Sequence, residues 1–396
     1  ATSPGQSFAI AVFNQSFTDA FRLSEKQLTG AFGLGTLLAC FSLPLFGAVM
    51  DRWGIRRAMS LAALLLGFAC LFASQVNGLV MLFVAFFLLR MLGNGALSLF
   101  AQNTPAMWFE RRLGTAVGLK NIASVLIMGQ VPLLLRVLID GVGWRWAYAI
   151  CGVAVWAIMF PILALLFRNR PEDVGQLPDG GDGVDRPLTQ NDEPAATAVV
   201  SFDLRGAMRT RAYWIMFLVQ STWAMIGTAL IFNIQKVFMT NGLTAASADV
   251  SLAWCFSLMA VMQLIGGLLA DRVRLNFLVS AAFAGMTGGI AILLFAGGDW
   301  TSSGYGLYGL AQGLLGSTVA TLWARYFGRL HIGKIRGSVT MAVVAGSALG
   351  PFVMGLSYDV FDSYAPSLCG FLTLCGMLTF AALWATQPRH AVAVKR

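Results

Sequence analysis

Apolar runs long enough to cross a lipid bilayer recur from one end of this chain to the other. A membrane-spanning helix needs about 20 predominantly apolar residues, and nearly every run here approaches that length. Charged residues make up only 11% of the 396 residues, whereas a soluble domain carries about 25%. Because a soluble enzyme of this size would need more charge on its surface, the chain is predicted to be an all-α, polytopic membrane protein.

Hydropathy separates the runs into twelve segments, six on each side of a polar stretch. The predicted spans are 1–17, 27–50, 58–77, 79–108, 114–139, 144–167, 212–238, 247–270, 276–298, 303–326, 337–358 and 366–387. The first is shorter than a spanning helix, so we expect the first helix to be truncated in this sequence. We predict two six-helix bundles, 1–168 and 211–396, the second with a short cytoplasmic tail. The stretch 169–210 is rich in Pro, Gly and acidic residues, which is typical of a flexible linker.

Basic residues are distributed unevenly between the two sets of loops. If the loop 51–57 is cytoplasmic, 20 of the 27 Lys and Arg residues fall on the cytoplasmic face and 4 on the other. By the positive-inside rule, this asymmetry predicts that both termini and the linker are cytoplasmic, and we expect a bacterial cytoplasmic membrane. Topology thus explains the net charge of +9, which does not indicate nucleic-acid binding.

The two halves repeat each other at offsets between 218 and 220 positions. The matched pairs are Gly47 with Gly267, Asp51-Arg52 with Asp271-Arg272, Asn94-Gly95 with Gln312-Gly313, Pro132 with Pro351, and Asp140 with Asp359. Such a repeat indicates that each half is one bundle. It also favours a solute site between the two bundles, near the membrane midplane.

The loop from Gly47 to Arg57 combines glycine, an acid and several arginines at the edge of a predicted span. Glycine lets two helices approach closely, and an acid there can pair with an arginine or with a helix N-terminus. Because such a pairing would lock one arrangement of the cytoplasmic side, we interpret the loop as a gate. The predicted gate residues are Gly47, Asp51, Arg52, Gly54, Arg56 and Arg57, with Gly267, Asp271 and Arg272 in the second copy.

The pattern Gly-x-x-x-Asp-Arg-x-Gly-x-Arg-Arg resembles the signature loop of the major facilitator superfamily, and the weaker copy at 267–274 lies where that family repeats it. The resemblance implies the twelve-helix major facilitator fold and a secondary transporter that works by alternating access. Within that superfamily, several stretches resemble the oxalate/formate antiporter and monocarboxylate porter branch. They are 3–8, 12–13, 90–96, 103–104, 108–112, 143–145 and 170–180.

This branch implies small carboxylates as substrates, but the chain departs from it at two helices. Carboxylate-binding members resemble one another in an arginine on the eighth helix, and Gln263 stands near the expected position here. The eleventh predicted helix also lacks the lysine that many members carry. The usual anion clamp is therefore absent from these helices, which leaves other cations as candidates.

Three cations lie inside predicted spans, at Arg90, Lys120 and Arg136. A charge at bilayer depth costs at least about 2.5 to 3.5 kcal/mol on insertion scales, so each should face a cavity or find a partner. Arg90 lies about 16 Å along its helix, near mid-bilayer, and is the best candidate to bind a solute anion; a structural arginine is the alternative. Lys120 either reaches a cavity or extends toward the interface. Arg136 is expected to pair with Asp140.

Polar side chains at cavity depth complete the predicted substrate site. Interhelical hydrogen bonds explain many such residues, so we expect about a third of them to touch solute. The candidates that accompany Arg90 and Lys120 are Gln6, Asn14, Asn94, Asn121, Gln220, Asn233, Gln263 and Gln312.

Together these features favour a transporter of a small, monocarboxylate-like organic anion or of another small polar metabolite. An exporter of amphipathic or drug-like compounds is the alternative, since the chain has 29 Phe and 11 Trp, although lipid contact also explains aromatic residues. No Asp or Glu lies in the middle of a predicted span. Without such a carboxylate, the possible mechanisms are anion exchange, facilitated diffusion or a proton carried with the substrate. The expected partners are therefore a small-molecule substrate and the lipid bilayer, and a coupling proton or a counter-anion is left open.

Enzymatic motifs are absent from the sequence. We find no catalytic, nucleotide-binding or metal-binding pattern, and the six cysteines lie inside apolar stretches without a CxxC pair. We therefore expect no enzymatic activity, no cofactor and no metal site.

Overall fold

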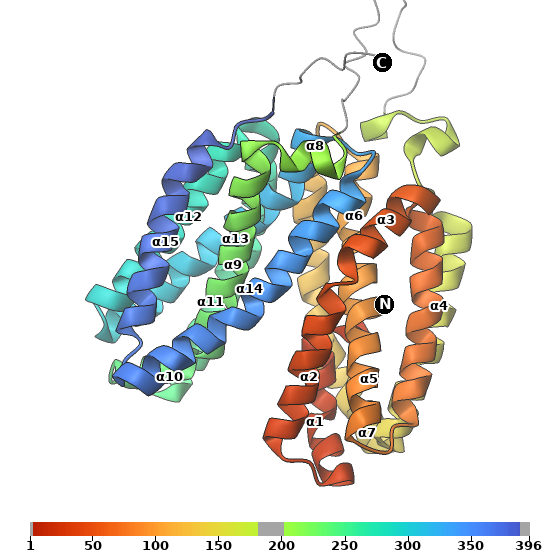
Figure 1. Cartoon of the computed structure of the whole chain (residues 1–396), viewed down its shortest axis with the longest axis horizontal. Helices are drawn as coiled ribbons and strands as arrows, with labels where there is room; N and C mark the ends of the chain where they lie inside the picture. Colours follow the sequence, from red (N-terminus) through yellow and green to blue (C-terminus); the bar gives the residue numbers. More distant parts are fainter. Residues whose placement is uncertain (1–2, 181–201, 389–396) are drawn as a thin grey trace, which may run out of the picture. The chain divides into compact units, whose positions relative to one another are not determined.

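The computed structural model describes residues 3–180 and 202–388, and every element in these ranges is a helix (Figure 1). The central part of the predicted linker, 181–201, and the predicted cytoplasmic tail from 389 onward lie outside the described residues. In the described parts of that linker the chain forms short helices that hydropathy does not predict. These are η4 (Pro171–Val174), η5 (Pro178–Gly180) and α8 (Leu204–Met208).

The first half of the chain forms the elements that precede this linker. They are η1 (Ser3–Gly5), α1 (Ser7–Phe21), α2 (Glu25–Cys40), α3 (Leu43–Trp53), α4 (Ile55–Ser74), α5 (Leu79–Leu89), η2 (Arg90–Leu97), α6 (Ser98–Trp108), α7 (Leu113–Pro161) and η3 (Ile162–Leu166). Of these, η2 and η3 are π-helical turns that continue the helix before them.

The second half forms the elements that follow the linker. They are α9 (Arg211–Phe232), α10 (Ile234–Thr240), α11 (Ala245–Arg272), α12 (Leu275–Phe295), η6 (Gly298–Trp300), α13 (Thr301–Phe327), α14 (Ile332–Phe361) and α15 (Ala365–Trp384).

Length and hydropathy identify most of the membrane spans among the described helices. Eight helices are long and apolar enough to cross a membrane, and the bent pair Gly30–Cys40 and Leu43–Trp53 makes a ninth. The short α1 and the less apolar α13 add two, and α7 divides into two arms at Gly143. The described residues therefore account for the twelve predicted spans.

Local sequence signals explain where several helices begin and bend. Ser24 and Gln27 form a capping box at the start of α2, where each side chain bonds to the backbone N–H of the other residue. Gly54 ends α3 with a φ of +81°, a conformation that favours glycine. Gly143 has a φ of +79° and bends α7 where the sequence predicts a break between two separate helices. The predicted break between two helices is therefore present, and Gly143 alone makes it.

The helices group into two compact units. The first unit contains the described residues within Ala1–Trp108, Ala123–Asn191 and His331–Met341. The second unit contains the described residues within Phe109–Ile122, Asp192–Leu330 and Ala342–Arg396. The first turns of α7 therefore belong to the second unit, and the first turns of α14 belong to the first unit.

Aromatic side chains fill the interior of both units. In the first, the ring of Phe13 lies 4.0 Å from that of Tyr148, and both side chains are at most 2% exposed. In the second, α12 packs against α13 and α15, and Trp323 packs 5.5 Å from Phe327 and 5.9 Å from Tyr213. Many Leu, Val, Phe and Trp side chains are exposed on the helices, as expected where the surrounding solvent is lipid.

Candidate functional site

The acid of the first predicted gate loop binds the start of a helix. The Asp51 carboxylate, near the end of α3, accepts hydrogen bonds from the backbone N–H groups of Gly333 and Lys334, both at 2.9 Å. These are the second and third residues of α14, where N–H groups have no acceptor within the helix. A carboxylate at this position also interacts favourably with the helix dipole. The contact lies inside the first unit.

The second copy of the loop makes the same contact inside the second unit. Asp271, near the end of α11, accepts hydrogen bonds from the N–H groups of Gly114 and Thr115, both at 2.8 Å, and from the Thr115 hydroxyl at 2.7 Å. Gly114 and Thr115 are the second and third residues of α7. They precede Gly333 and Lys334 by 219 positions. The internal repeat therefore supplies both partners of the contact, the acid and the helix start.

Glycine pairs bring two backbones together beside each acid. A Cβ atom on Gly47 would overlap the carbonyl oxygen of Gly333, and a Cβ atom on Gly333 would overlap that of Gly47. Gly114 and Gly267 have the same mutual relationship in the second unit. Each acid can reach its N–H donors because these four residues lack side chains.

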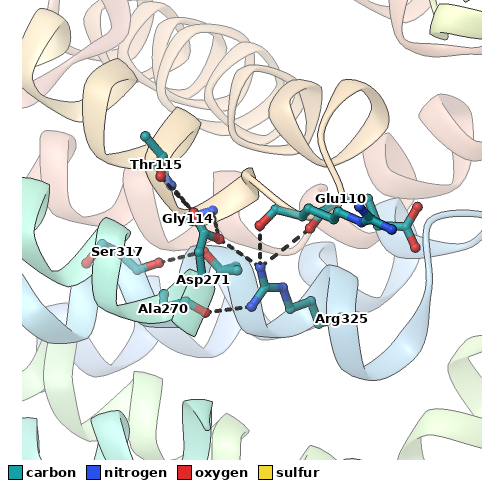
Figure 2. A network of polar contacts seen from close by, with 9 residues as sticks. Glu110, Gly114, Thr115, Ala270, Asp271, Ser317 and Arg325 are labelled. Carbon is teal, nitrogen blue, oxygen red and sulfur yellow. Dashed lines mark hydrogen bonds and ion pairs between the residues drawn. The ribbon is translucent and has the colours of Figure 1, made fainter. Parts of the chain in front are cut away.

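Arg325 distinguishes the second contact from the first, as Figure 2 shows. Its Nη2 forms an ion pair with Asp271 Oδ1 at 2.7 Å, and its Nη1 donates to the carbonyl oxygen of Ala270 at 2.5 Å. Nη2 also donates to the carbonyl oxygen of Arg111 at 3.1 Å. One side chain of α13 thus holds the end of α11 and the segment before α7. The residue 219 positions before Arg325 is Ala106, which carries no charge.

The other arginines of the predicted gate have different environments. Arg56 donates from Nε to the carbonyl oxygen of Leu163 and from Nη2 to that of Ala164, both at 2.7 Å. It therefore fastens the start of α4 to η3. The remaining three are exposed; they are Arg52, Arg57 and Arg272.

Arg90 is buried in the first unit, with 8% of its surface exposed. Its Nε donates to Thr36 Oγ1 and its Nη1 to the carbonyl oxygen of Gly5, both at 3.1 Å. The guanidinium carbon lies 5.3 Å from the centre of the Phe32 ring, within the range of a cation–π contact. Arg90 is also the first residue of the π-helical turn η2, and such turns are frequent at functional sites.

Two further predicted residues lie beside the same turn. Asn94 is half-buried within η2, and Gln6 Nε2 donates to Ser98 Oγ at 3.1 Å, directly after η2. The structure therefore brings Arg90, Asn94 and Gln6 to η2. Asn14, in contrast, is exposed further along α1.

A pocket of about 510 Å³ opens within the second unit and includes Gln312. The Gln312 side chain accepts a hydrogen bond from Trp223 Nε1 and donates one to the Tyr308 hydroxyl. Most of the remaining lining is apolar, with Phe232 and Phe256 among its larger side chains. The side-chain amide of Gln312 is thus held between two aromatic residues in a mostly apolar pocket.

Gln263 lies elsewhere in the second unit, beside the start of α7. Its Oε1 is buried and has no hydrogen-bond partner among the described residues. A Cβ atom on Gly118 would come within 3.1 Å of the Gln263 carbonyl oxygen, so α7 and α11 are close at this level. Lys120 and Asn121 follow within one turn of α7, and both are half-buried.

The two other predicted amides have structural partners. Gln220 Oε1 accepts a hydrogen bond from Trp323 Nε1 at 2.6 Å. Asn233 Nδ2, which is buried, donates to the carbonyl oxygen of Ala229 at 3.0 Å, within its own helix. These contacts are typical of polar residues that join or cap helices.

The expected ion pair between Arg136 and Asp140 is not formed. Both residues are described and both are exposed, but the structure shows no ion pair between them. Their spacing of four residues permits such a pair on a helix. An exposed ion pair contributes little to stability, however, so little stability is lost when the pair is absent.

Arg336 is a buried cation that the sequence analysis counts only among the basic residues of the cytoplasmic loops. Its side chain is buried, with 5% exposed. Nη1 donates to the carbonyl oxygen of Gln102 at 2.9 Å and to Asn103 Oδ1 at 3.0 Å. A signal was available, because Arg336 directly precedes the predicted span 337–358.

Metal-ligating groups are not clustered in the part of the chain that the structure describes. No three His, Cys, Asp or Glu side chains in these ranges are placed to hold a metal ion.

Comparison with known proteins identifies the family. The sequence model of the Major Facilitator Superfamily matches residues 2–351. The crystal structure of the superfamily transporter FucP has a TM-score of 0.70 with this chain at 16% sequence identity, covering 98% of this chain and 96% of FucP. The chain therefore belongs to the major facilitator superfamily and is a multi-pass membrane transporter, not an enzyme. The predicted family and twelve-helix fold are confirmed.

Three other proteins illustrate the range of its relatives. Mouse monocarboxylate transporter 11 is 26% identical over 392 residues, covering 92% of this chain and 80% of the relative. The uncharacterized transporter YhjX of Escherichia coli K12 is 23% identical over 301 residues, covering 74% of this chain and 69% of YhjX. The structure of the human organic anion transporter MFSD10 has a TM-score of 0.62 at 15% identity, covering 96% of this chain and 89% of that one.

Proposed function

We propose that this chain is a secondary transporter that moves a small, monocarboxylate-like organic anion by alternating access. The observation that carries the proposal is the burial of the Arg90 guanidinium in the interior of the first unit, beside η2. A cation at bilayer depth is expensive and marks a functional site by default. A carboxylate that reached Arg90 would bring the opposite charge to it.

The contacts of Arg90 suit a reversible anion site. The guanidinium carries five N–H donors in a planar fork that matches a carboxylate. Thr36 and Gly5 hold the group through its Nε and Nη1 atoms, and Phe32 lies against it. These partners fix the orientation of the fork before a substrate arrives, which reduces the entropy lost on binding.

Two relatives agree with this substrate class. Monocarboxylate transporter 11 and the organic anion transporter MFSD10 are both named for anionic substrates. We therefore favour an organic anion over a sugar, although FucP is a fucose–proton symporter. No Asp or Glu lies mid-span in the sequence, so we expect anion exchange, facilitated diffusion or a proton carried with the substrate.

We propose a matching role for the two acid loops as gates. Asp51 and Asp271 each hold the start of a helix from the opposite half of the sequence. A transport cycle would require these contacts to break and re-form, so they would control the rate of the conformational change and not the affinity for substrate. By the positive-inside rule both loops would face the cytoplasm, and the membrane would be a bacterial cytoplasmic membrane.

The pocket of the second unit favours one other function, export of amphipathic compounds. Its aromatic and apolar lining suits a hydrophobic ligand. The single amide, Gln312, is already engaged by Trp223 and Tyr308. In such a transporter Arg90 would be structural.

Counterflow into proteoliposomes distinguishes these functions. Purified protein would be reconstituted with unlabelled solute inside, and uptake of radiolabelled monocarboxylates, neutral metabolites and cationic dyes would be compared. We expect saturable uptake of at least one monocarboxylate, with no saturable uptake of dyes. Saturable dye uptake without monocarboxylate uptake would instead support the amphipathic exporter.

A further inference from the structure

A second cavity, of about 910 Å³, opens at one end of the second unit. It lies where α9 and α12 begin and where α13 and α15 end. Figure 1 shows α15 ending, and α8 leading into α9, at the same end of this unit. The cavity is separate from the apolar pocket, because the two share no lining residue.

Hydrogen bonds between neighbouring helices fix the wall of this cavity. Asn276 Nδ2, at the start of α12, donates to the carbonyl oxygen of Leu383 near the end of α15, at 3.0 Å. Gln387 Nε2, beyond α15, donates to the carbonyl oxygen of Arg325 at 3.0 Å. The cavity is therefore a built feature of the bundle.

The charge of the cavity is positive. Arg211, Arg274 and Arg325 line it, and no Asp or Glu is among its described lining residues. Arg211 and Arg274 are exposed and reach solvent, whereas Arg325 is half-buried. Trp384 lies on the same rim with 76% of its surface exposed, and exposed tryptophan is typical of the membrane–water interface. The cavity thus combines three cations with an interfacial aromatic residue.

We propose that this cavity binds a phosphate-bearing anion, such as the headgroup of an anionic phospholipid, as a site distinct from the transport site. Arginine forks pair bidentately with phosphate oxygens, and basic pockets between transmembrane helices suit anionic headgroups. Leu275 and Val273 add apolar surface to the lining, which suits the glycerol and acyl part of a lipid. An inorganic phosphate would offer the same charged group without that apolar part.

Arg325 links this cavity to the gate. Arg325 lines the cavity, and its guanidinium pairs with Asp271 at 2.7 Å. An anion in the cavity would compete with Asp271 for that charge, so occupancy and the strength of the gate contact are coupled, and the coupling is reciprocal. The ligand would therefore regulate transport without being transported.

Thermal unfolding of the purified full chain in a neutral detergent tests the proposal. Three probes are titrated: short-chain phosphatidylglycerol, phosphatidylcholine with the same acyl chains, and inorganic phosphate. We expect saturable stabilisation by phosphatidylglycerol that exceeds that of phosphatidylcholine. In the double variant Arg211→Gln/Arg274→Gln the apparent affinity should fall about thirtyfold. The control Arg136→Gln/Lys236→Gln also removes two exposed cations, neither of which lines the cavity, and should match the unmodified protein.

The remaining outcomes separate the possible ligands. Saturable stabilisation by inorganic phosphate as well would support the site and show that the phosphate group alone suffices. Equal responses to phosphatidylglycerol and phosphatidylcholine, or equal affinities in the double variant and the control, would overturn the proposal. If the Gln variants unfold too readily, Arg211→Lys/Arg274→Lys keeps the charge and should retain binding within about threefold. None of these measurements uses the transported substrate. They can therefore be interpreted even if the proposed transport function is wrong.

Discussion

Asp271 and Arg325 form an ion pair of 2.7 Å in which the side chains are only 12% and 26% exposed. The pair reinforces the hydrogen bonds that Asp271 accepts from backbone N–H groups at the start of α7. Asp51 accepts the equivalent bonds at the start of α14. The repeat therefore conserves the acid and the helix start, while the arginine occurs only in the second copy. We expect the second contact to be the harder one to open.

A double-mutant cycle tests this pair. We expect Asp271→Asn and Arg325→Gln to be coupled by about 0.5 to 3 kcal/mol, because the two groups share one network. Thermal unfolding of the two single variants and the double variant gives the coupling. The neighbouring and exposed Arg272→Gln provides the matched control, and its coupling to Asp271→Asn should be close to zero. Additive effects of Asp271→Asn and Arg325→Gln would mean that the pair contributes nothing.

The first gate contact predicts a rate effect at Asp51. Asp51→Asn keeps the size of the side chain but removes the charge that binds the α14 N-terminus. We expect the transport rate to fall about tenfold, the effect of about 1.4 kcal/mol on a barrier, while the affinity for substrate stays within about threefold. Initial rates and binding are measured on the same reconstituted protein, with Arg136→Gln, which is exposed and outside the acid loops, as the control. Loss of substrate binding would place Asp51 in the substrate site instead.

Close backbone packing predicts that Gly114 and Gly333 tolerate no side chain. A Cβ atom at either position would overlap the facing backbone, so we expect Gly114→Ala and Gly333→Ala to destabilise the protein by about 1 to 3 kcal/mol. Gly376 is the control, since no atom lies within 4 Å of its added Cβ. There the substitution should be neutral or stabilise the helix by up to about 1 kcal/mol. Equal melting temperatures for all three variants would argue against the packing.

Burial predicts a structural role for Arg336. Replacing it with Gln removes the donors to the Gln102 carbonyl oxygen and to Asn103 Oδ1. A buried acceptor left without a partner costs about 1 to 3 kcal/mol, so we expect Arg336→Gln to lower the melting temperature. Lys334→Gln, two residues earlier and exposed, should have little effect. A variant as stable as the unmodified protein would show that water replaces Arg336 readily.

Much of the fold is predictable because membrane spans are encoded locally. The run predicted at 79–108 ends at Trp108, as α6 does, and the run predicted at 303–326 differs from α13 by two residues at its start and one at its end. A break at a single residue is predictable as well, because the sequence predicts separate helices before and after Gly143 and its non-helical φ of +79° divides α7 into two arms there. The prediction fails for the short helices η4, η5 and α8, because each is too short to form an apolar run of spanning length.

The residues of the candidate site were predictable only where their chemistry is local in sequence. Asp51 and Asp271 stand in a short motif that hydropathy and spacing identify. Their partners are 282 and 157 positions away, and a helix N-terminus has no side-chain signature at Gly114 or Gly333. The 219-residue offset between those two glycines was visible, but it acquires a meaning only when the acids are seen to bind there.

The polar candidates show the same limit. Composition predicts that Gln220 and Asn233 lie at cavity depth, but it cannot tell a solute contact from a bond to Trp323 or to a carbonyl in the same helix. Arg90 was singled out by its charge and by its depth near mid-bilayer, and the structure adds the contacts that orient it.

The most direct test of the proposed function compares monocarboxylate counterflow in Arg90→Gln with that in Arg136→Gln. Both variants remove one positive charge from the first unit, but Arg90 is buried beside η2 and Arg136 is exposed. We expect saturable exchange to be lost in Arg90→Gln, with at least about a tenfold fall in transport efficiency, and to be retained in Arg136→Gln. Unchanged exchange in a folded Arg90→Gln protein would contradict the assignment of Arg90 to the substrate site.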